Sequence, residues 1–112
     1  MLPTILHLIA ALGTIAVGVY SLVWPLRVRG FTGLEAPGPR GVTEIRAVLG
    51  GFFVGLGLFA IVLGGAAYTL LGLAYFVVAA VRAVSMFVDG SVERSNLISV
   101  ASEVLFGIML VV

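Results

Sequence analysis

The chain has 112 residues, of which 62% are hydrophobic and only 10% are charged, and its net charge is +1. A soluble domain is roughly 45–50% apolar and about 25% charged, and a domain this small buries only about two-thirds of the surface that its unfolded chain exposes. The composition therefore excludes a soluble globular domain, a disordered chain and a nucleic-acid-binding protein, and it indicates a lipid environment. The absence of cysteine excludes disulfides, thiolate metal sites, iron–sulfur clusters and a thiol nucleophile.

Four apolar stretches approach the length of about 20 residues that a membrane-spanning helix needs. The first, residues 3–23, ends at a Trp-Pro dipeptide, an interfacial aromatic followed by a residue that stops helices. Because it lacks a basic amino-terminal region and a cleavage pattern, we expect a retained span rather than a signal peptide. Residues 24–42 follow, and their Pro-Gly-Pro run predicts an irregular loop.

The next two predicted spans, residues 43–63 and 66–88, are joined only by a Gly-Gly dipeptide, which indicates a tight antiparallel hairpin. A short loop, residues 89–95, leads to the last span, residues 96–112. At 1.5 Å per residue the last span is about 25 Å long, which is marginal for a hydrocarbon core of about 30 Å. It either crosses a locally thinned bilayer, packs against its longer neighbours, or continues in residues absent from this sequence.

The basic residues indicate how the chain is oriented in the membrane. All six are arginines, and each lies in or beside the two longer loops: Arg27, Arg29, Arg40, Arg46, Arg82 and Arg94. The positive-inside rule places these loops in the cytoplasm and both chain ends outside. The predicted fold is a single all-α domain over residues 1–112, an integral membrane four-helix bundle with antiparallel up-down topology, N-out and C-out.

Small residues predict where the helices approach closely, because association in lipid depends on packing rather than on apolar contact. Ala47, Gly51 and Gly55 form a ridge of small residues, four positions apart, on the second span. We expect this ridge to pack inside the bundle, with a homodimer face as the alternative. Similar ridges lie on the first and third spans, at Ala10, Thr14 and Gly18 and at Ala79 and Ala83.

Two opposite charges fall at matching depths in the last two spans. The rise of a helix places Glu103 about 10 Å and Arg82 about 9 Å below the arginine-bearing face. Because an unpaired intramembrane charge costs several kcal/mol, we expect the two side chains to pair. Glu44, Arg46 and Asp89 lie towards the same face. The five residues predict one charged network that holds the second, third and fourth spans in register; the alternatives are a binding or transfer site for protons or an anionic head group, or acid–base catalysis.

The only histidine, His7, lies in the first span near the other membrane face. An intramembrane histidine can ligate the metal of a haem or a chlorophyll. Since no second candidate ligand accompanies it, we expect an interfacial residue, and pigment or haem ligation is the alternative.

The motif Glu-x-Arg-Ala-x-x-Gly-Gly at residues 44–51, together with Arg82 and the dipeptide Asp89-Gly90, resembles a bacterial family of small four-helix membrane proteins, domain of unknown function four-three-four-five. The resemblance covers most of the chain, although Leu49 stands where that family typically has an aromatic residue. It implies the four-helix fold and the charged cluster, and it implies no reaction. Small multidrug-resistance transporters share the length and helix number, but their essential glutamate lies in the first helix, which has none here.

These features predict a small multi-pass protein of structural or accessory-subunit type in a bacterial inner membrane. We find no activated nucleophile, metal-ligand or cofactor motif and therefore expect neither enzymatic activity nor a cofactor. The protein would act in the lipid bilayer alone, as a homo-oligomer or docked on a larger membrane complex. The alternative is a binder or carrier of a small amphipathic or anionic ligand, such as a lipid or quinone head group, seated at Arg46, Arg82 and Glu103.

Overall fold

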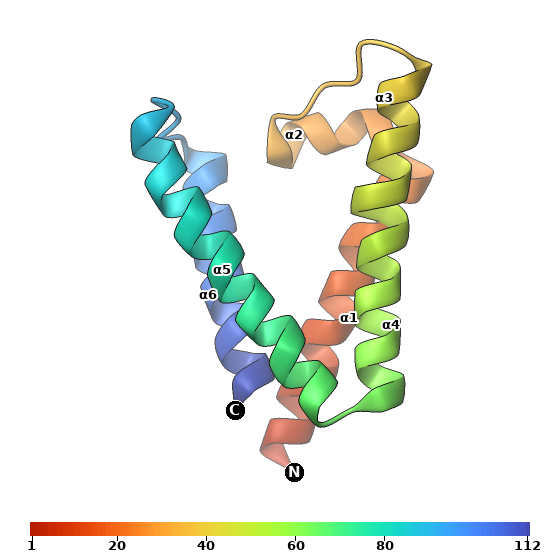
Figure 1. Ribbon diagram of the computed structural model, residues 1–112, viewed down its shortest axis with the longest axis vertical. Coiled ribbons are helices and arrows are strands. Elements are labelled where there is room, and N and C mark those ends of the chain that lie inside the picture. Colours follow the sequence, from red (N-terminus) through yellow and green to blue (C-terminus); the bar gives the residue numbers. More distant parts are fainter.

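The computed structural model describes residues 1–112, and all its regular secondary structure is helical (Figure 1). In chain order its elements are α1 (Leu2–Val23), the 3₁₀ helix η1 (Pro25–Val28), α2 (Arg29–Thr32), α3 (Pro39–Glu44), the π-helix η2 (Ile45–Phe52), α4 (Phe53–Leu63), α5 (Ala66–Val88) and α6 (Arg94–Val111). The elements α3, η2 and α4 follow one another without a break and form one long helix.

Four helices are long and apolar enough to cross a membrane: Leu2–Val23, Pro39–Leu63, Ala66–Val88 and Arg94–Val111. The expected all-α class with four helices of spanning length is therefore confirmed, and these are the dimensions of a multi-pass membrane protein. The second of them begins at Pro39 rather than at residue 43. Proline suits the first turn of a helix, because its missing N–H would have no partner there.

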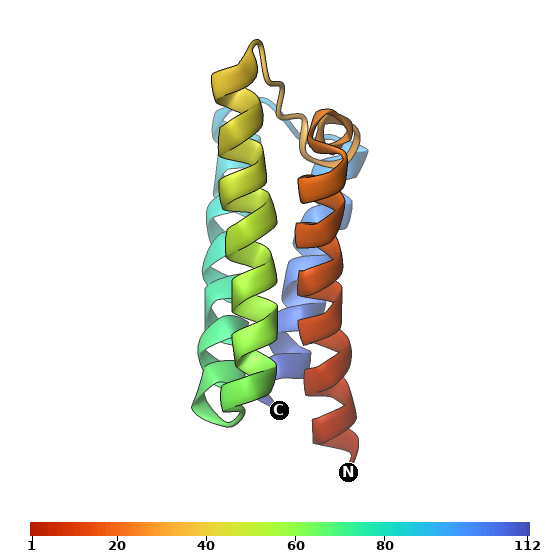
Figure 2. The same cartoon turned by 90° about the vertical axis from the view of Figure 1, so that its right-hand side faces the viewer.

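The segment between α1 and α3 is more ordered than the predicted irregular loop. After α1 ends, the chain turns into η1 and α2. The Thr32 hydroxyl donates a hydrogen bond to the Val28 carbonyl over 2.7 Å and accepts one from the Leu34 N–H over 3.0 Å. Gly33, with φ of +74°, then ends α2 in a left-handed conformation that glycine adopts without strain. As a result α2 lies across the space between the arginine-rich ends of the long helices and touches α6 (Figures 1 and 2).

The long helices form two pairs that diverge, rather than one closed bundle. One pair is α1 with η2 and α4, and the other is α5 with α6; contacts between the pairs are far fewer. The two pairs meet at the end that carries both termini and the Gly64-Gly65 turn, and they separate towards the end where α2 lies (Figure 1). The predicted bundle is thus open at its arginine-bearing end.

Glycine residues allow the close approach within each pair. A Cβ atom at Gly18 of α1 would lie 2.7 Å from the Gly50 carbonyl oxygen and 2.7 Å from the Val54 nitrogen. In the other pair, a Cβ atom at Gly72 of α5 would lie 3.0 Å from the Gly107 carbonyl oxygen. Both contacts are to backbone, so the two helices of each pair can approach this closely only where no side chain intervenes.

The ridge of Ala47, Gly51 and Gly55 does not pack inside the fold, contrary to expectation. A Cβ atom at Gly55 would meet nothing within 4 Å, and one at Gly51 would meet only the Arg46 carbonyl of its own helix, at 3.8 Å. Ala47 is exposed. The helix turns instead so that Gly50 and Gly57, which lie on another face, contact α1.

Gly18→Ala should destabilise the α1–α4 pair, and Gly55→Ala serves as its matched control. The added methyl at Gly18 would force the two backbones apart and cost about 1–3 kcal/mol. The same methyl at Gly55 enters open space and should be neutral or stabilise the helix by up to about 1 kcal/mol. Unfolding by SDS titration in mixed detergent micelles measures both changes. Equal stabilities of the two variants would contradict the assigned helix faces.

Candidate functional site

The central polar feature is an ion pair between α5 and α6. Arg82 Nε donates to Glu103 Oε1 over 2.9 Å, and Arg82 Nη2 donates to Glu103 Oε2 over 2.8 Å. The Arg82 side chain is 30% exposed and the Glu103 side chain 12%. The geometry is the two-pronged arrangement in which a planar guanidinium matches a carboxylate. The two residues that were expected to pair because they lie at matching depths are thus the two that form this ion pair.

Asn96 of α6 fixes the other edge of the guanidinium. Its Oδ1 accepts a hydrogen bond from Arg82 Nη1 over 3.0 Å, and its Nδ2 donates to the Ser91 carbonyl over 2.9 Å. Arg82 is therefore held by two residues of α6, and through Asn96 it is tied to the loop between α5 and α6. A charged group with this many fixed partners is oriented before any ligand arrives.

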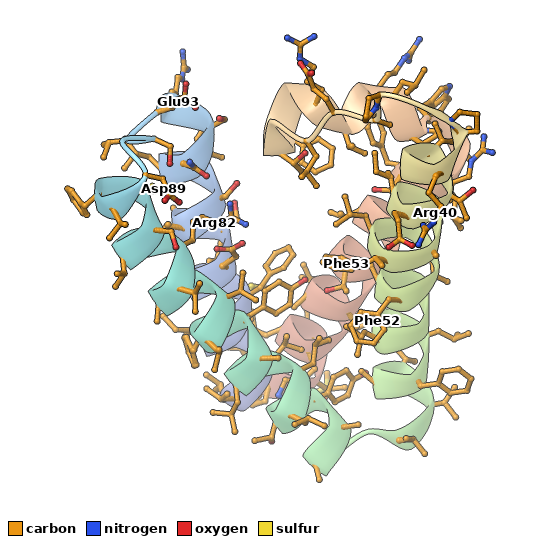
Figure 3. All side chains as sticks on the ribbon, turned by 45° about the horizontal axis from the view of Figure 1, so that its top comes forward. Arg40, Phe52, Phe53, Arg82, Asp89 and Glu93 are labelled. Carbon is orange, nitrogen blue, oxygen red and sulfur yellow. The ribbon has the colours of Figure 1, made fainter.

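A cavity of about 300 Å³ lies between the two helix pairs and includes this ion pair in its wall. Its lining comes from α1, α2, η2, α4, α5 and α6: Val17, Phe31, Thr32, Leu49, Phe53, Tyr75, Val78, Arg82, Ile98, Ser99, Ser102, Glu103 and Phe106. Figure 3 shows Arg82 and Phe53 on opposite sides of the space between the pairs. The cavity exists because the pairs diverge, and α2 contributes two of its side chains at the open end.

The lining is mostly apolar, with the polar groups on one side. Aliphatic and aromatic side chains come from every contributing element, whereas the charges and the two serine hydroxyls come from α5 and α6. Ser102 donates its hydroxyl hydrogen to the Ile98 carbonyl over 2.9 Å, so its oxygen remains free to accept. An apolar chamber with a few fixed polar groups is the usual composition of a small-molecule site.

Tyr75 was not singled out from the sequence, although it links the two helix pairs. Its hydroxyl lies 2.5 Å from Thr14 Oγ1, and the Thr14 hydroxyl also donates to the Ala10 carbonyl over 2.9 Å. Its ring packs edge-on against Phe106, with the ring centres 5.6 Å apart. A signal was present in the sequence, since Tyr75 lies two helical turns before Arg82 and therefore on the same face of α5.

The predicted five-residue network is divided in the structure. Glu44 forms an ion pair with Arg40, one turn earlier in its own helix, on the helix pair opposite Arg82 (Figure 3). Arg46 Nε donates to the Leu22 carbonyl near the end of α1 over 3.1 Å, where the helix dipole favours a cation. Neither residue joins Arg82 and Glu103, so the ion pair locks α5 to α6 only, and the second span is not part of it. Asp89 caps α5 and lines a separate cavity with Arg82.

His7 of α1 packs against Tyr68 of α5 near the closed end of the fold, with the ring centres 4.7 Å apart. Its Nε2 atom is buried and has no hydrogen-bond partner. No group of three His, Asp or Glu side chains in the chain is placed to hold a metal ion.

The fold and the site define a class, a multi-pass helical membrane protein with an ion pair inside its spanning region. The chain matches the family described as "Domain of unknown function (DUF4345)" over residues 2–112, and it belongs to that family. The resemblance seen in the sequence is thereby confirmed over nearly the whole chain. No curated protein and no solved structure matches it.

Glu103→Gln should destabilise the protein strongly, because it leaves the Arg82 cation unpaired in an apolar environment. We expect a loss of about 2–4 kcal/mol, near the value for breaking a buried pair. Glu44→Gln is the control: it breaks the exposed pair with Arg40 and should cost less than about 1 kcal/mol. SDS titration of the purified variants measures both losses, and a Glu103→Gln variant as stable as the control would show that the pair contributes little.

Proposed function

We propose that this protein binds a small amphipathic molecule in the cavity between its two helix pairs, as a binder or carrier rather than an enzyme. The observation that supports this is the cavity of about 300 Å³ with the Arg82–Glu103 pair in its wall. That volume is at the small end of ligand sites, which range from about 300 to 1,000 Å³. A compact ring or short chain would occupy the apolar part, and its polar group would face the ion pair.

The charge of the site favours an uncharged head group. Arg82 and Glu103 neutralise each other, so an anion would gain the attraction of one and meet the repulsion of the other. A hydroxyl or carbonyl group has no such conflict, because it can accept from a remaining guanidinium N–H or donate to a carboxylate oxygen. A neutral lipid or a quinone-type ring carries such groups, whereas a free phosphate or carboxylate does not suit the site.

Binding without reaction follows from how the ion pair is held. Both carboxylate oxygens of Glu103 already accept hydrogen bonds from Arg82. A general base must be free to take a proton from the reacting group, and a carboxylate engaged in this way is a poor one. We therefore propose that the pair orients a ligand and does not transform it.

The proposed location is a bacterial inner membrane, with the arginine-bearing ends in the cytoplasm and both termini outside. The support is the distribution of arginine, since Arg27, Arg29, Arg40 and Arg94 lie in the loops or first helical turns at the end where the helix pairs diverge, and no arginine lies at the other end. In this orientation the cavity lies in the cytoplasmic half of the bilayer. A ligand would enter from that leaflet, between the diverging pairs and past α2.

A second candidate function is that of an accessory subunit in a homo-oligomer or larger membrane complex. It is favoured by the ridge of Ala47, Gly51 and Gly55, which faces away from the rest of the chain. Small residues on an outward helix face allow another helix to approach closely in lipid. This role and ligand binding use different faces of the molecule and are compatible.

Ser99→Leu tests the ligand proposal, because Ser99 lines the cavity and a leucine side chain would fill part of it. The full chain is extracted from membranes in mild detergent, and native mass spectrometry measures any small molecule that stays bound. We expect the wild-type protein to retain an uncharged amphipathic molecule at about one per chain and the variant to retain at least about tenfold less, since losing 1.4 kcal/mol of binding free energy has this effect.

Ala101→Leu is the matched control, since Ala101 lies on the same helix, is exposed and does not line the cavity. It should retain the molecule as the wild-type protein does. Equal retention by both variants, or a wild-type protein that carries only anionic molecules, would contradict the proposal.

A further inference from the structure

A second cavity, of about 320 Å³, lies at the end of α5 and in the loop that leads to α6. It shares Arg82 with the cavity between the pairs, but most of its wall is different. Its polar lining is Arg82, Ser85, Asp89, Ser91 and Asn96. Along α5 these polar groups give way to exposed Val81 and Val78 in the direction of the membrane interior. The cavity therefore changes from polar to apolar with depth.

Asp89 has no partner in the chain, although its position calls for one. The ion pairs of the chain join Arg29 to Glu35, Arg40 to Glu44 and Arg82 to Glu103. Asp89 is the residue that caps the carboxyl end of α5, where the helix dipole is negative and a cation is favoured. Of the residues that line this cavity, only Arg82 and Asp89 are charged. Its wall therefore presents one cation and one carboxylate that do not pair with each other, and the Asp89 carboxylate attracts a cationic group.

The wall of this cavity also carries hydrogen-bond donors. Ser91 Oγ accepts from Asn96 Nδ2 over 3.3 Å, which leaves its own hydroxyl hydrogen free to donate. A guanidinium has five N–H donors, and the contacts of Arg82 with Glu103 and Asn96 do not use all of them. The cavity thus offers an acceptor at the helix end, donors from Arg82 and Ser85 closer to the membrane interior, and a further donor from Ser91 in the loop.

We propose that this second cavity binds the head group of an ethanolamine-type phospholipid. The ammonium group donates to Asp89, the phosphate oxygens accept from Arg82 and the serine hydroxyls, and an acyl chain lies along Val81. The order of groups along α5 matches their order in the lipid, since Arg82 lies about 10 Å deeper than Asp89 by the rise of the helix. The proposal concerns a different ligand and a different wall from the cavity between the pairs, and each can fail without the other.

The charges exclude the commonest alternatives. A glycerol-type anionic phospholipid has no cation for Asp89, so it leaves that carboxylate unpaired. A choline-type lipid carries a cation but no N–H, so it loses the charge-assisted hydrogen bonds to the carboxylate. The site should therefore distinguish the three head groups by the number of ammonium hydrogens and by net charge.

Competition among lipids with identical acyl chains tests this proposal on the full chain in detergent. Native mass spectrometry of the protein with equal amounts of ethanolamine, choline and glycerol phospholipids should show the ethanolamine lipid in clear excess. Asp89→Asn should weaken that lipid about tenfold and remove the preference. Glu93→Gln is the control, because it removes a neighbouring exposed carboxylate that does not line the cavity (Figure 3), and it should leave the preference intact.

A second measurement needs no variant. Successive N-methylation of the ethanolamine head group should weaken binding to the wild-type protein stepwise, as each N–H is lost. Equal binding of all three lipid classes, affinity unchanged by methylation, or an Asp89→Asn variant that keeps the preference would each overturn the proposal.

Discussion

The structure depends on the need to neutralise two charges inside an apolar medium. Arg82 and Glu103 satisfy this need with each other, at 2.8–2.9 Å, and both belong to the α5–α6 pair. The other pair therefore carries no charge that must be matched across the fold. Its long helices approach α5 and α6 at one end, and the pairs diverge at the other (Figure 1). The ion pair therefore does not tie the two helix pairs together, and the cavity between them has it in its wall.

Helix depth was the part of the site that the sequence could predict, because the rise per residue fixes it. Arg82 and Glu103 fall at matching depths on consecutive spans, and they pair. Depth says nothing about the direction in which a side chain points around its helix axis. Glu44 and Arg46 lie at similar depths, but Glu44 has Arg40 one turn away and Arg46 reaches the free carbonyl of Leu22. Local partners of this kind compete with distant ones and cannot be ranked from spacing alone.

The helices and their packing were predictable to different degrees. Long apolar stretches identified the four spanning helices, since lipid demands about 20 such residues in each. The glycine pattern identified small residues but not the face in use: Gly50 packs against α1, whereas the adjacent Gly51 faces away. Neighbouring residues are rotated by about 100° around a helix. The small residues around Gly50 and Gly51 therefore form ridges on two different faces, and the sequence does not say which face packs against α1. The cavity had no signal of its own in the sequence, because it arises from the angle between the pairs.

Arg82 lines both cavities, and the carboxylate that accompanies it differs between them. Towards the space between the pairs its charge is cancelled by Glu103, so that wall is polar but neutral and suits a head group that exchanges hydrogen bonds. Towards the end of α5 the wall carries the guanidinium and the unpaired carboxylate of Asp89, which together suit a head group with a phosphate and an ammonium group. The guanidinium is fixed by Glu103 and Asn96, so it is already in place for either ligand. The ion pair can thus hold α5 to α6 and also present ordered hydrogen-bond donors to both cavities. A structural role and a ligand-binding role for Arg82 are therefore compatible.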